Sequence, residues 1–152
     1  MAQPNHANEL KRALARSDGA TLISNMDAFI AHYAAGNPDW PDEQADAFVD
    51  ILDSYLDPDK ALAYITLAAW RTDDGRFLAM IGAGLLEDLL NGLPDVFIER
   101  VVAEGRRSPR FRWLLNCPFQ EDIPEPVWEA IRPFRWTRPF EEPRPETLPA
   151  QS

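Results

Sequence analysis

Residues Phe77 to Leu115 read FLAMIGAGLLEDLLNGLPDVFIERVVAEGRRSPRFRWLL, and the clearest indication of the architecture lies at their start. The first ten of them, Phe77 to Leu86, contain no charged side chain. A helix that is apolar on every side has no face suited to water, so other helices must surround it. The stretch therefore predicts a central buried helix that runs to about Asn91.

On both sides of this stretch, apolar residues recur at intervals of three and four rather than two, which is the spacing of a helix face. Gly and Pro divide the chain into short segments. The pattern predicts an all-α, single-domain bundle of seven to eight short helices. The expected helices cover about residues 8–16, 21–35, 42–56, 58–70, 77–91, 94–105, 109–117 and 124–132.

Small and capping residues mark several helix ends. Gly36 and Gly105 are expected to end two helices, because glycine is the usual residue just after a helix C-terminus. Ser108 before Pro109 is expected to start another helix, with serine as the N-cap. Gly82 and Gly84, inside the central helix, indicate a close helix crossing at some cost in helix propensity.

The last twenty residues differ from the rest of the chain. Residues 133–152 contain five prolines, which predicts an extended C-terminal arm after a helical domain of residues 1–132. Phe134, Trp136 and Phe140 are costly to leave in water. The arm is therefore expected either to pack over the helical domain or to wait for a partner.

Composition excludes some classes of protein. The first twenty residues lack the apolar core of a signal peptide, and no run approaches a membrane span, so a cytoplasmic protein without a membrane span is expected. A lone cysteine, Cys117, agrees with a reducing compartment. The formal net charge of −10 argues against nucleic-acid binding and favours a basic protein partner. The oligomeric state does not follow from these residues.

The charge is also uneven along the chain. Ten acidic residues and one basic residue lie between Asp18 and Lys60, whereas five arginines against one glutamate lie between Arg100 and Arg112. The arginines either complement two helix ends or form an anion site near Ser108. The two regions predict surfaces of opposite charge.

Three spaced elements resemble a bacterial domain-of-unknown-function family of small helical proteins. The family has a Gly-Pro-Leu-Glu element in an apolar helix, then a Pro-x-Phe-Arg element, then a Val-Trp helix. The resemblance covers about residues 58–132, and Leu85 stands where the family usually has Pro. It implies an all-helical fold, with antiparallel helix pairs stacked as in short repeats, and it implies no activity. The matching positions are Gly84, Leu86, Glu87, Pro109, Phe111, Arg112, Val127 and Trp128.

Catalytic and cofactor motifs are not evident. Glu87 and Arg112 are expected to form a structural ion pair between two packed helices, and the alternative makes Glu87 a general acid or base beside Arg110 and Arg112. That alternative lacks a visible nucleophile or metal. Only two histidines, His6 and His32, are present, so no zinc site of histidines is expected. We therefore expect no enzyme, no cofactor and no metal.

The remaining candidates are surfaces for protein contact. Trp70, Trp113 and Trp128 lie on helix faces and are expected in the core, whereas the other two tryptophans lie in a turn and in the arm. The expected partner-binding residues are Trp40, Asp42, Asp46, Asp50, Asp53, Trp136 and Phe140.

Three functions compete on these grounds. The first is an immunity or inhibitor role, in which the aspartate-rich helix covers a basic partner. The alternative is an accessory or scaffold subunit that docks on a larger assembly through its C-terminal arm. The third, from another class, is an enzyme or small-ligand binder around Glu87.

Overall fold

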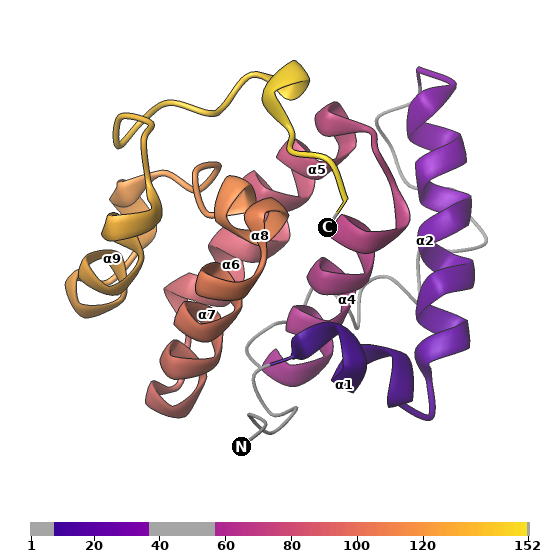
Figure 1. The fold of residues 1–152 in the computed structure, drawn as a ribbon, viewed down its shortest axis with the longest axis horizontal. Coiled ribbons are helices and arrows are strands. Elements are labelled where there is room, and N and C mark those ends of the chain that lie inside the picture. Colours follow the sequence, from indigo (N-terminus) through magenta and orange to yellow (C-terminus); the bar gives the residue numbers. More distant parts are fainter. Residues whose placement is uncertain (1–7, 37–56, 152) are drawn as a thin grey trace.

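The computed structural model describes residues 8–36 and 57–151. Within these ranges the chain forms seven helices, one of them built from three consecutive segments, and no strand, so the all-α prediction is confirmed (Figure 1). Short 3₁₀ turns lie at Gln120–Asp122, Arg132–Phe134 and Pro145–Thr147. The helices are α1 Glu9–Ala15, α2 Gly19–Ala34, α4 Pro58–Arg71, α5 Gly75–Ile81 with η3 Gly82–Leu86 and α6 Glu87–Asn91, α7 Asp95–Arg107, α8 Pro109–Leu114 and α9 Glu125–Ile131.

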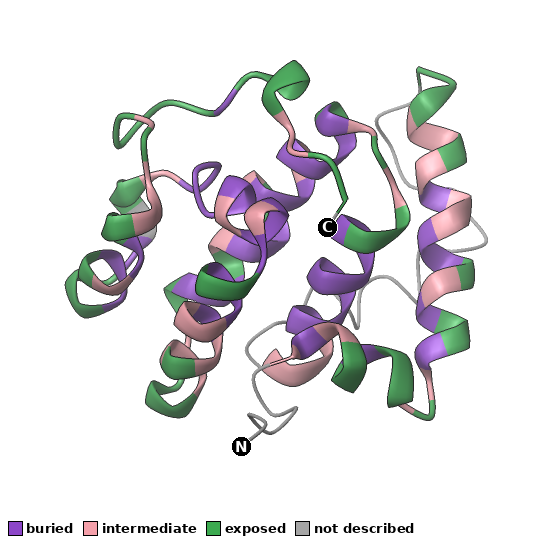
Figure 2. Ribbon diagram, viewed as in Figure 1, coloured by how far each residue is buried: buried purple, intermediate pink, exposed green. Residues whose placement is uncertain are grey.

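The most completely buried helix is α4, and not the apolar stretch from Phe77 that the sequence predicted as central. Nine consecutive residues of α4, from Ala61 to Ala69, are buried (Figure 2). Its alanines let neighbouring helices approach on every side, and the hydroxyl of Thr66 donates to the carbonyl of Leu62 within the same helix. Small side chains and an internally satisfied hydroxyl therefore suit the central position.

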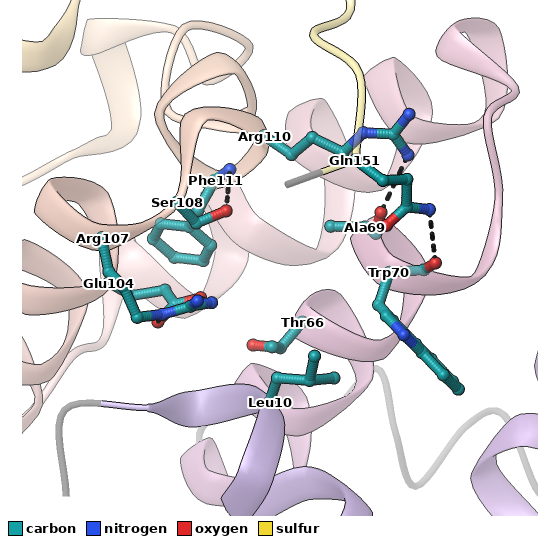
Figure 3. Close-up of a pocket in the computed structure, with 10 residues that line it drawn as sticks. All are labelled: Leu10, Thr66, Ala69, Trp70, Glu104, Arg107, Ser108, Arg110, Phe111 and Gln151. Carbon is teal, nitrogen blue, oxygen red and sulfur yellow. Dashed lines mark hydrogen bonds and ion pairs between the residues drawn. The ribbon is translucent and has the colours of Figure 1, made fainter. Parts of the chain in front are cut away.

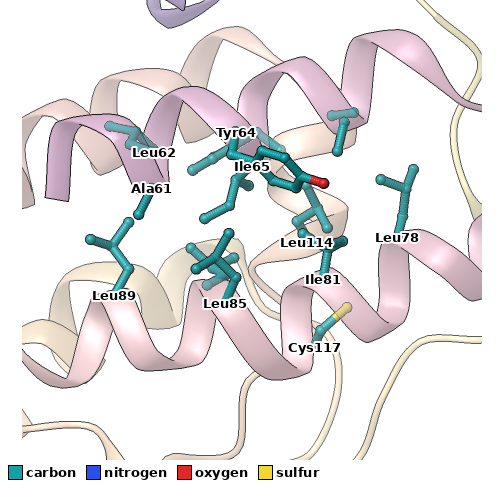
Figure 4. Packing of buried hydrophobic residues seen from close by; sticks show 14 of the residues in the cluster. Ala61, Leu62, Tyr64, Ile65, Leu78, Ile81, Leu85, Leu89, Leu114 and Cys117 are labelled. Carbon is teal, nitrogen blue, oxygen red and sulfur yellow. The ribbon is translucent and has the colours of Figure 1, made fainter. Parts of the chain in front are cut away.

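The apolar stretch itself lies antiparallel to α4. Figure 4 shows Leu89 opposite Ala61 at one end of the pair and Leu78 near the other end. The stretch passes through a π-helical turn at Gly82–Leu86, the place where Leu85 replaces the proline of the resembling family. One side of this helix stays open, since Gly84 is exposed and a Cβ there would meet nothing within 4 Å.

Gly82 and Gly84 were both expected at a close crossing, but only Gly82 lies at one. A Cβ at Gly82 would lie 2.6 Å from the Cβ of Cys117, so the chain after α8 presses directly on this helix. Gly36 has φ 90° and ends α2 as expected. Gly105, in contrast, does not end α7, which continues to Arg107; a Cβ at Gly105 would lie 2.9 Å from the ring of Phe134. Close packing, not capping, explains that glycine.

An ion-pair network joins α1, α4 and α7. The guanidinium of Arg100 makes two hydrogen bonds to the carboxylate of Glu9, of 2.9 and 2.6 Å, and a third of 2.8 Å to Asp59. Arg16 extends the network from Asp59 to Asp18. Glu9 is only 2% exposed, so its charge depends on Arg100 for compensation. The network fixes the first helix on the bundle.

Candidate functional site

The C-terminal arm runs along the outside of the domain after α9. It leaves α9, crosses above α8 and α5, and ends beside the C-terminal end of α4 (Figure 1). The arm is extended apart from the 3₁₀ turns at Arg132–Phe134 and Pro145–Thr147, because its prolines prevent a continuous helix. It packs over the helical domain, which was one of the two arrangements that the sequence left open.

Asn116 holds the first part of the arm. This side chain is fully buried and uses all of its hydrogen-bonding groups. Its Oδ1 accepts from the backbone N–H groups of Trp136, at 2.7 Å, and Thr137, at 3.1 Å, and from the Thr137 hydroxyl. Its Nδ2 donates to the carbonyls of Arg112 and Phe134. A single buried amide thus replaces the secondary structure that the arm lacks.

Arg135 holds the same segment from the other side. Its guanidinium donates to the carbonyls of Leu115, at 2.9 Å, and Pro118, at 2.7 Å, and lies 4.5 Å from the centre of the Trp128 ring. Burial lowers the pKa of Arg135, and its Nε has no hydrogen-bond partner. The positive charge is compensated by carbonyl dipoles and an aromatic face. No motif in the sequence marked Asn116 or Arg135 for this role.

The end of the arm is fixed to α4, α5 and α8. Arg110 donates to the carbonyl of Pro149 at 2.7 Å, and also to the carbonyls of Ala69 and Thr72. The indole N–H of Trp113 donates to the hydroxyl of Thr147 at 3.0 Å. The backbone of Gly75 is so close to the arm that a Cβ would lie 2.3 Å from the carbonyl oxygen of Pro145. The arm is therefore tied to the domain at both ends.

Two large aromatic side chains nevertheless remain in solvent on this fixed arm. Trp136 is 59% exposed and Phe140 is 65% exposed. Phe140 makes an edge contact with the half-buried ring of Phe119, with centroids 6.2 Å apart. The backbone between the two aromatics is fixed in turn, since Gln120 N donates to the carbonyl of Pro139. Both residues were predicted as partner-binding residues, and both lie on the surface.

Charged side chains of both signs accompany these aromatics. Arg138, Glu141 and Glu142 are exposed. One carboxylate oxygen of Glu141 accepts from the backbone N–H of Arg138 at 3.2 Å, which closes a turn. The guanidinium of Arg138 and the carboxylate of Glu142 make no hydrogen bond or ion pair with any described residue. We call the exposed surface of Phe119, Trp136, Arg138, Phe140 and Glu142 the arm face.

The predicted ion pair between Glu87 and Arg112 is wrong. Glu87 accepts a hydrogen bond of 2.8 Å from the backbone N–H of Phe119, and Arg112 donates to the carbonyls of Gly105 and Arg106. The last carbonyls of a helix lack partners within it, and Arg112 reaches back to satisfy two of them on α7. Glu87 satisfies a loop amide in the same way. Each charge therefore has a backbone partner.

The arginines near α7 and α8 do not form a common anion site. Arg107 makes two hydrogen bonds to the buried carboxylate of Glu104, of 2.9 and 2.6 Å, which raises the pKa of Arg107. Arg100 is paired with Glu9, and Arg110 with carbonyls and Asp73. Four of the five arginines of this region, Arg100, Arg107, Arg110 and Arg112, are thus bound to groups of the fold, and Arg106 is exposed. Of the two alternatives for these arginines, the geometry supports the one in which they stabilise helix ends and neighbouring elements.

A small polar cavity lies between α1, α4, the junction of α7 and α8, and the end of the arm (Figure 3). Its volume is about 70 Å³, close to that of two water molecules and far below that of an organic-ligand site. Most of its polar groups are paired with one another, as Glu104 is with Arg107. Glu87 is not among its lining residues, which are Leu10, Thr66, Ala69, Trp70, Glu104, Arg107, Ser108, Arg110, Phe111 and Gln151.

Trp70 corrects a further prediction. It was expected in the core with Trp113 and Trp128, which are 0% and 5% exposed, but it is 37% exposed and is one of the residues that line this cavity. Its position near the C-terminal end of α4 carries it past the neighbouring helices. The carboxamide of Gln151 donates to its carbonyl at 2.6 Å, so the arm covers this helix end.

The acidic candidates of the sequence lie outside the described residues. Trp40, Asp42, Asp46, Asp50 and Asp53 all belong to the range 37–56. Among residues 8–36 and 57–151, no group of three or more His, Cys, Asp or Glu side chains is placed to hold a metal ion. In the same ranges, no helix has both the length and the apolar character that a membrane span requires.

Comparison with known proteins identifies a family and no function. The comparison with curated proteins and the comparison with solved structures each gave no match. The model of a family of unknown function (DUF6869) matches residues 37–138, about two thirds of the chain. This range contains the three elements from which the resemblance to a domain-of-unknown-function family was stated. The chain therefore belongs to the family of unknown function DUF6869.

Proposed function

We propose that this chain is a non-catalytic protein-interaction domain that binds a partner protein through its arm face. The observation that carries the proposal is the exposure of Trp136 and Phe140, at 59% and 65%, on a segment whose backbone is held on the helical domain by hydrogen bonds. Tryptophan and other large aromatics dominate the binding energy of protein interfaces. Their exposure on a fixed backbone suits them to contact another protein.

The fixed backbone matters because binding has an entropic cost. When a loop becomes ordered on binding, the loss of its conformational entropy offsets part of the interaction energy. Here Asn116 and Arg135 already hold the segment that carries both aromatics. We infer that the arm is preorganised, which agrees with the accessory or scaffold role in which the arm docks on a larger assembly.

A second candidate, the immunity or inhibitor role, rests on charge. Residues 37–56 contain six acidic residues and no basic residue, out of a net charge of −10 for the whole chain. A basic partner would be attracted to such a segment over long range, with an association rate that falls as salt rises. Both roles are those of a non-catalytic protein, and both fit a bacterial cytoplasmic location.

Affinity capture with matched variants tests the proposal. The tagged chain is incubated with a lysate of its source organism, beside the double variant Trp136→Ala, Phe140→Ala and the control Val96→Ala. Val96 is 66% exposed on α7, so its truncation removes a similar exposed fraction elsewhere. We expect the partner to be lost from the double variant alone.

Charge reversal separates the two candidates. The triple variant Asp46→Lys, Asp50→Lys, Asp53→Lys should keep a partner that binds the arm face. If the triple variant loses the partner while the aromatic variant keeps it, the arm-face proposal is wrong and the inhibitor role is favoured. Deleting residues 133–152 is a poor substitute, because it would also remove the hydrogen-bond partners of the buried side chains Asn116 and Trp113.

A further inference from the structure

The arm face carries two opposite charges that do not meet within one chain. Arg138 and Glu142 are four residues apart and both exposed, yet neither side chain has an ionic or hydrogen-bonded partner among the described residues. The turn closed by Glu141 and the backbone N–H of Arg138 lies between them. Both charges therefore remain available for a partner.

The whole arm is balanced in charge although the chain is strongly acidic. Residues 135–146 contain three arginines and three glutamates, whereas the chain has a net charge of −10. Two copies of an acidic protein repel one another, and the repulsion is weakest where their neutral surfaces meet. A second copy of this chain can thus approach the arm face more easily than most of the surface.

We propose that the arm face binds a second copy of this chain in a two-fold symmetric pair. In such a contact the same patch serves both copies, so Arg138 of each copy lies opposite Glu142 of the other. Trp136 and Phe140 of the two copies fill the centre and exclude water from the two ion pairs. This inference rests on the proposed function, since it names the protein that the arm face binds.

The exposed area predicts a weak pair. Large aromatic side chains bury about 150 to 250 Å² each, so the exposed fractions of Trp136 and Phe140 supply roughly 190 to 310 Å² per copy. A standard interface buries about 800 Å² per partner, and the flanking arm must provide the rest. We therefore expect a dimer that dissociates in the micromolar range.

Sedimentation velocity of the full chain between 1 and 500 µM tests the proposal. We expect the wild type to shift from monomer to dimer across this range, and Phe140→Ala and Arg138→Glu to raise the dissociation constant at least tenfold. Glu142→Arg should act in the same way. The double variant Arg138→Glu, Glu142→Arg should restore the wild-type dissociation constant within threefold, because both ion pairs are re-formed with exchanged signs.

The control is Arg76→Glu, which makes the same charge reversal at an exposed arginine on α5 and should leave the dimer unchanged. A wild type that stays monomeric to 500 µM would overturn the inference. A dimer whose dissociation constant is unchanged in all the arm-face variants would overturn it too. If the chain is monomeric but Trp136→Ala with Phe140→Ala still loses a captured partner, the inference fails while the proposed function stands. If the dimer forms as expected and no other protein is captured, the arm face binds this chain itself.

Discussion

Replacing Asn116 with alanine should release the arm from the domain. The substitution leaves the N–H groups of Trp136 and Thr137 and the carbonyl of Phe134 without their present partner. A buried polar group that loses its partner costs about 1 to 3 kcal/mol, but a released arm regains some bonds from water. We therefore expect the free energy of unfolding to fall by about 3 kcal/mol, from a total of roughly 5 to 15 kcal/mol.

Urea unfolding at 25 °C, followed by tryptophan fluorescence and by circular dichroism, measures the change. Asn91→Ala is the matched control, because Asn91 is exposed at the end of α6 and its loss should change the free energy by less than about 0.5 kcal/mol. Asn116→Asp keeps the acceptor for Trp136 and Thr137 but places a carboxylate against two carbonyls, so it should also destabilise. If Asn116→Ala lowers the free energy of unfolding by less than 0.5 kcal/mol, Asn116 does not hold the arm on the domain.

The other predictions concern the bundle, and each has an internal control. Glu9→Gln should lower the free energy of unfolding by about 3 kcal/mol, because it leaves Arg100 partly uncompensated; the exposed Glu99→Gln should have little effect in the same urea titration. Gly82→Ala should destabilise by about 1 to 3 kcal/mol through its clash with Cys117, whereas Gly84→Ala should stabilise by up to about 1 kcal/mol in thermal unfolding. Hydrogen bonds from Arg16 and Arg71 lower the pKa values of Asp18 and Asp27, so stability present above about pH 4 should be lost as the pH falls through the lowered values. Asp27→Asn should flatten that part of the stability–pH curve, and an unchanged curve in the double variant with Asp18→Asn would contradict the assignment.

Local signals predicted the helices well, since helix boundaries depend mainly on nearby residues. Ser108 caps α8 through a hydrogen bond of 3.1 Å from the backbone N–H of Phe111, and Gly36 ends α2, both as the sequence indicated. The helix expected at 42–56 lies outside the described residues. Capping interactions that lie within one turn of a helix end can therefore be predicted from the nearby sequence.

Packing between residues far apart in the sequence was less predictable, because it depends on which helices meet. The apolar run from Phe77 looked central, but alanines allow α4 to be surrounded more completely. Gly105 looked like a cap, but the ring of Phe134 packs against it. Hydrophobicity alone does not report how closely neighbouring helices can approach.

The candidate site likewise contains residues that the sequence predicted and a residue that it did not. Trp136 and Phe140 were predicted as partner-binding residues because they lie in the Pro-rich arm, and both are exposed there. Asn116 gave no signal, since a lone asparagine before Cys117 and Pro118 resembles an ordinary helix end. Its role depends on an arm that begins nearly twenty residues later in the chain.

Protein binding through the arm face requires a fixed arm, and amide hydrogen exchange measures this most directly. We expect the N–H groups of Trp136 and Thr137, which bind the buried Oδ1 of Asn116, to exchange as slowly as those of α8 and to lose this protection in Asn116→Ala. Exchange of both amides in the wild type at the rate of an unstructured peptide would contradict a fixed arm, and with it the presentation of Trp136 and Phe140 to a partner.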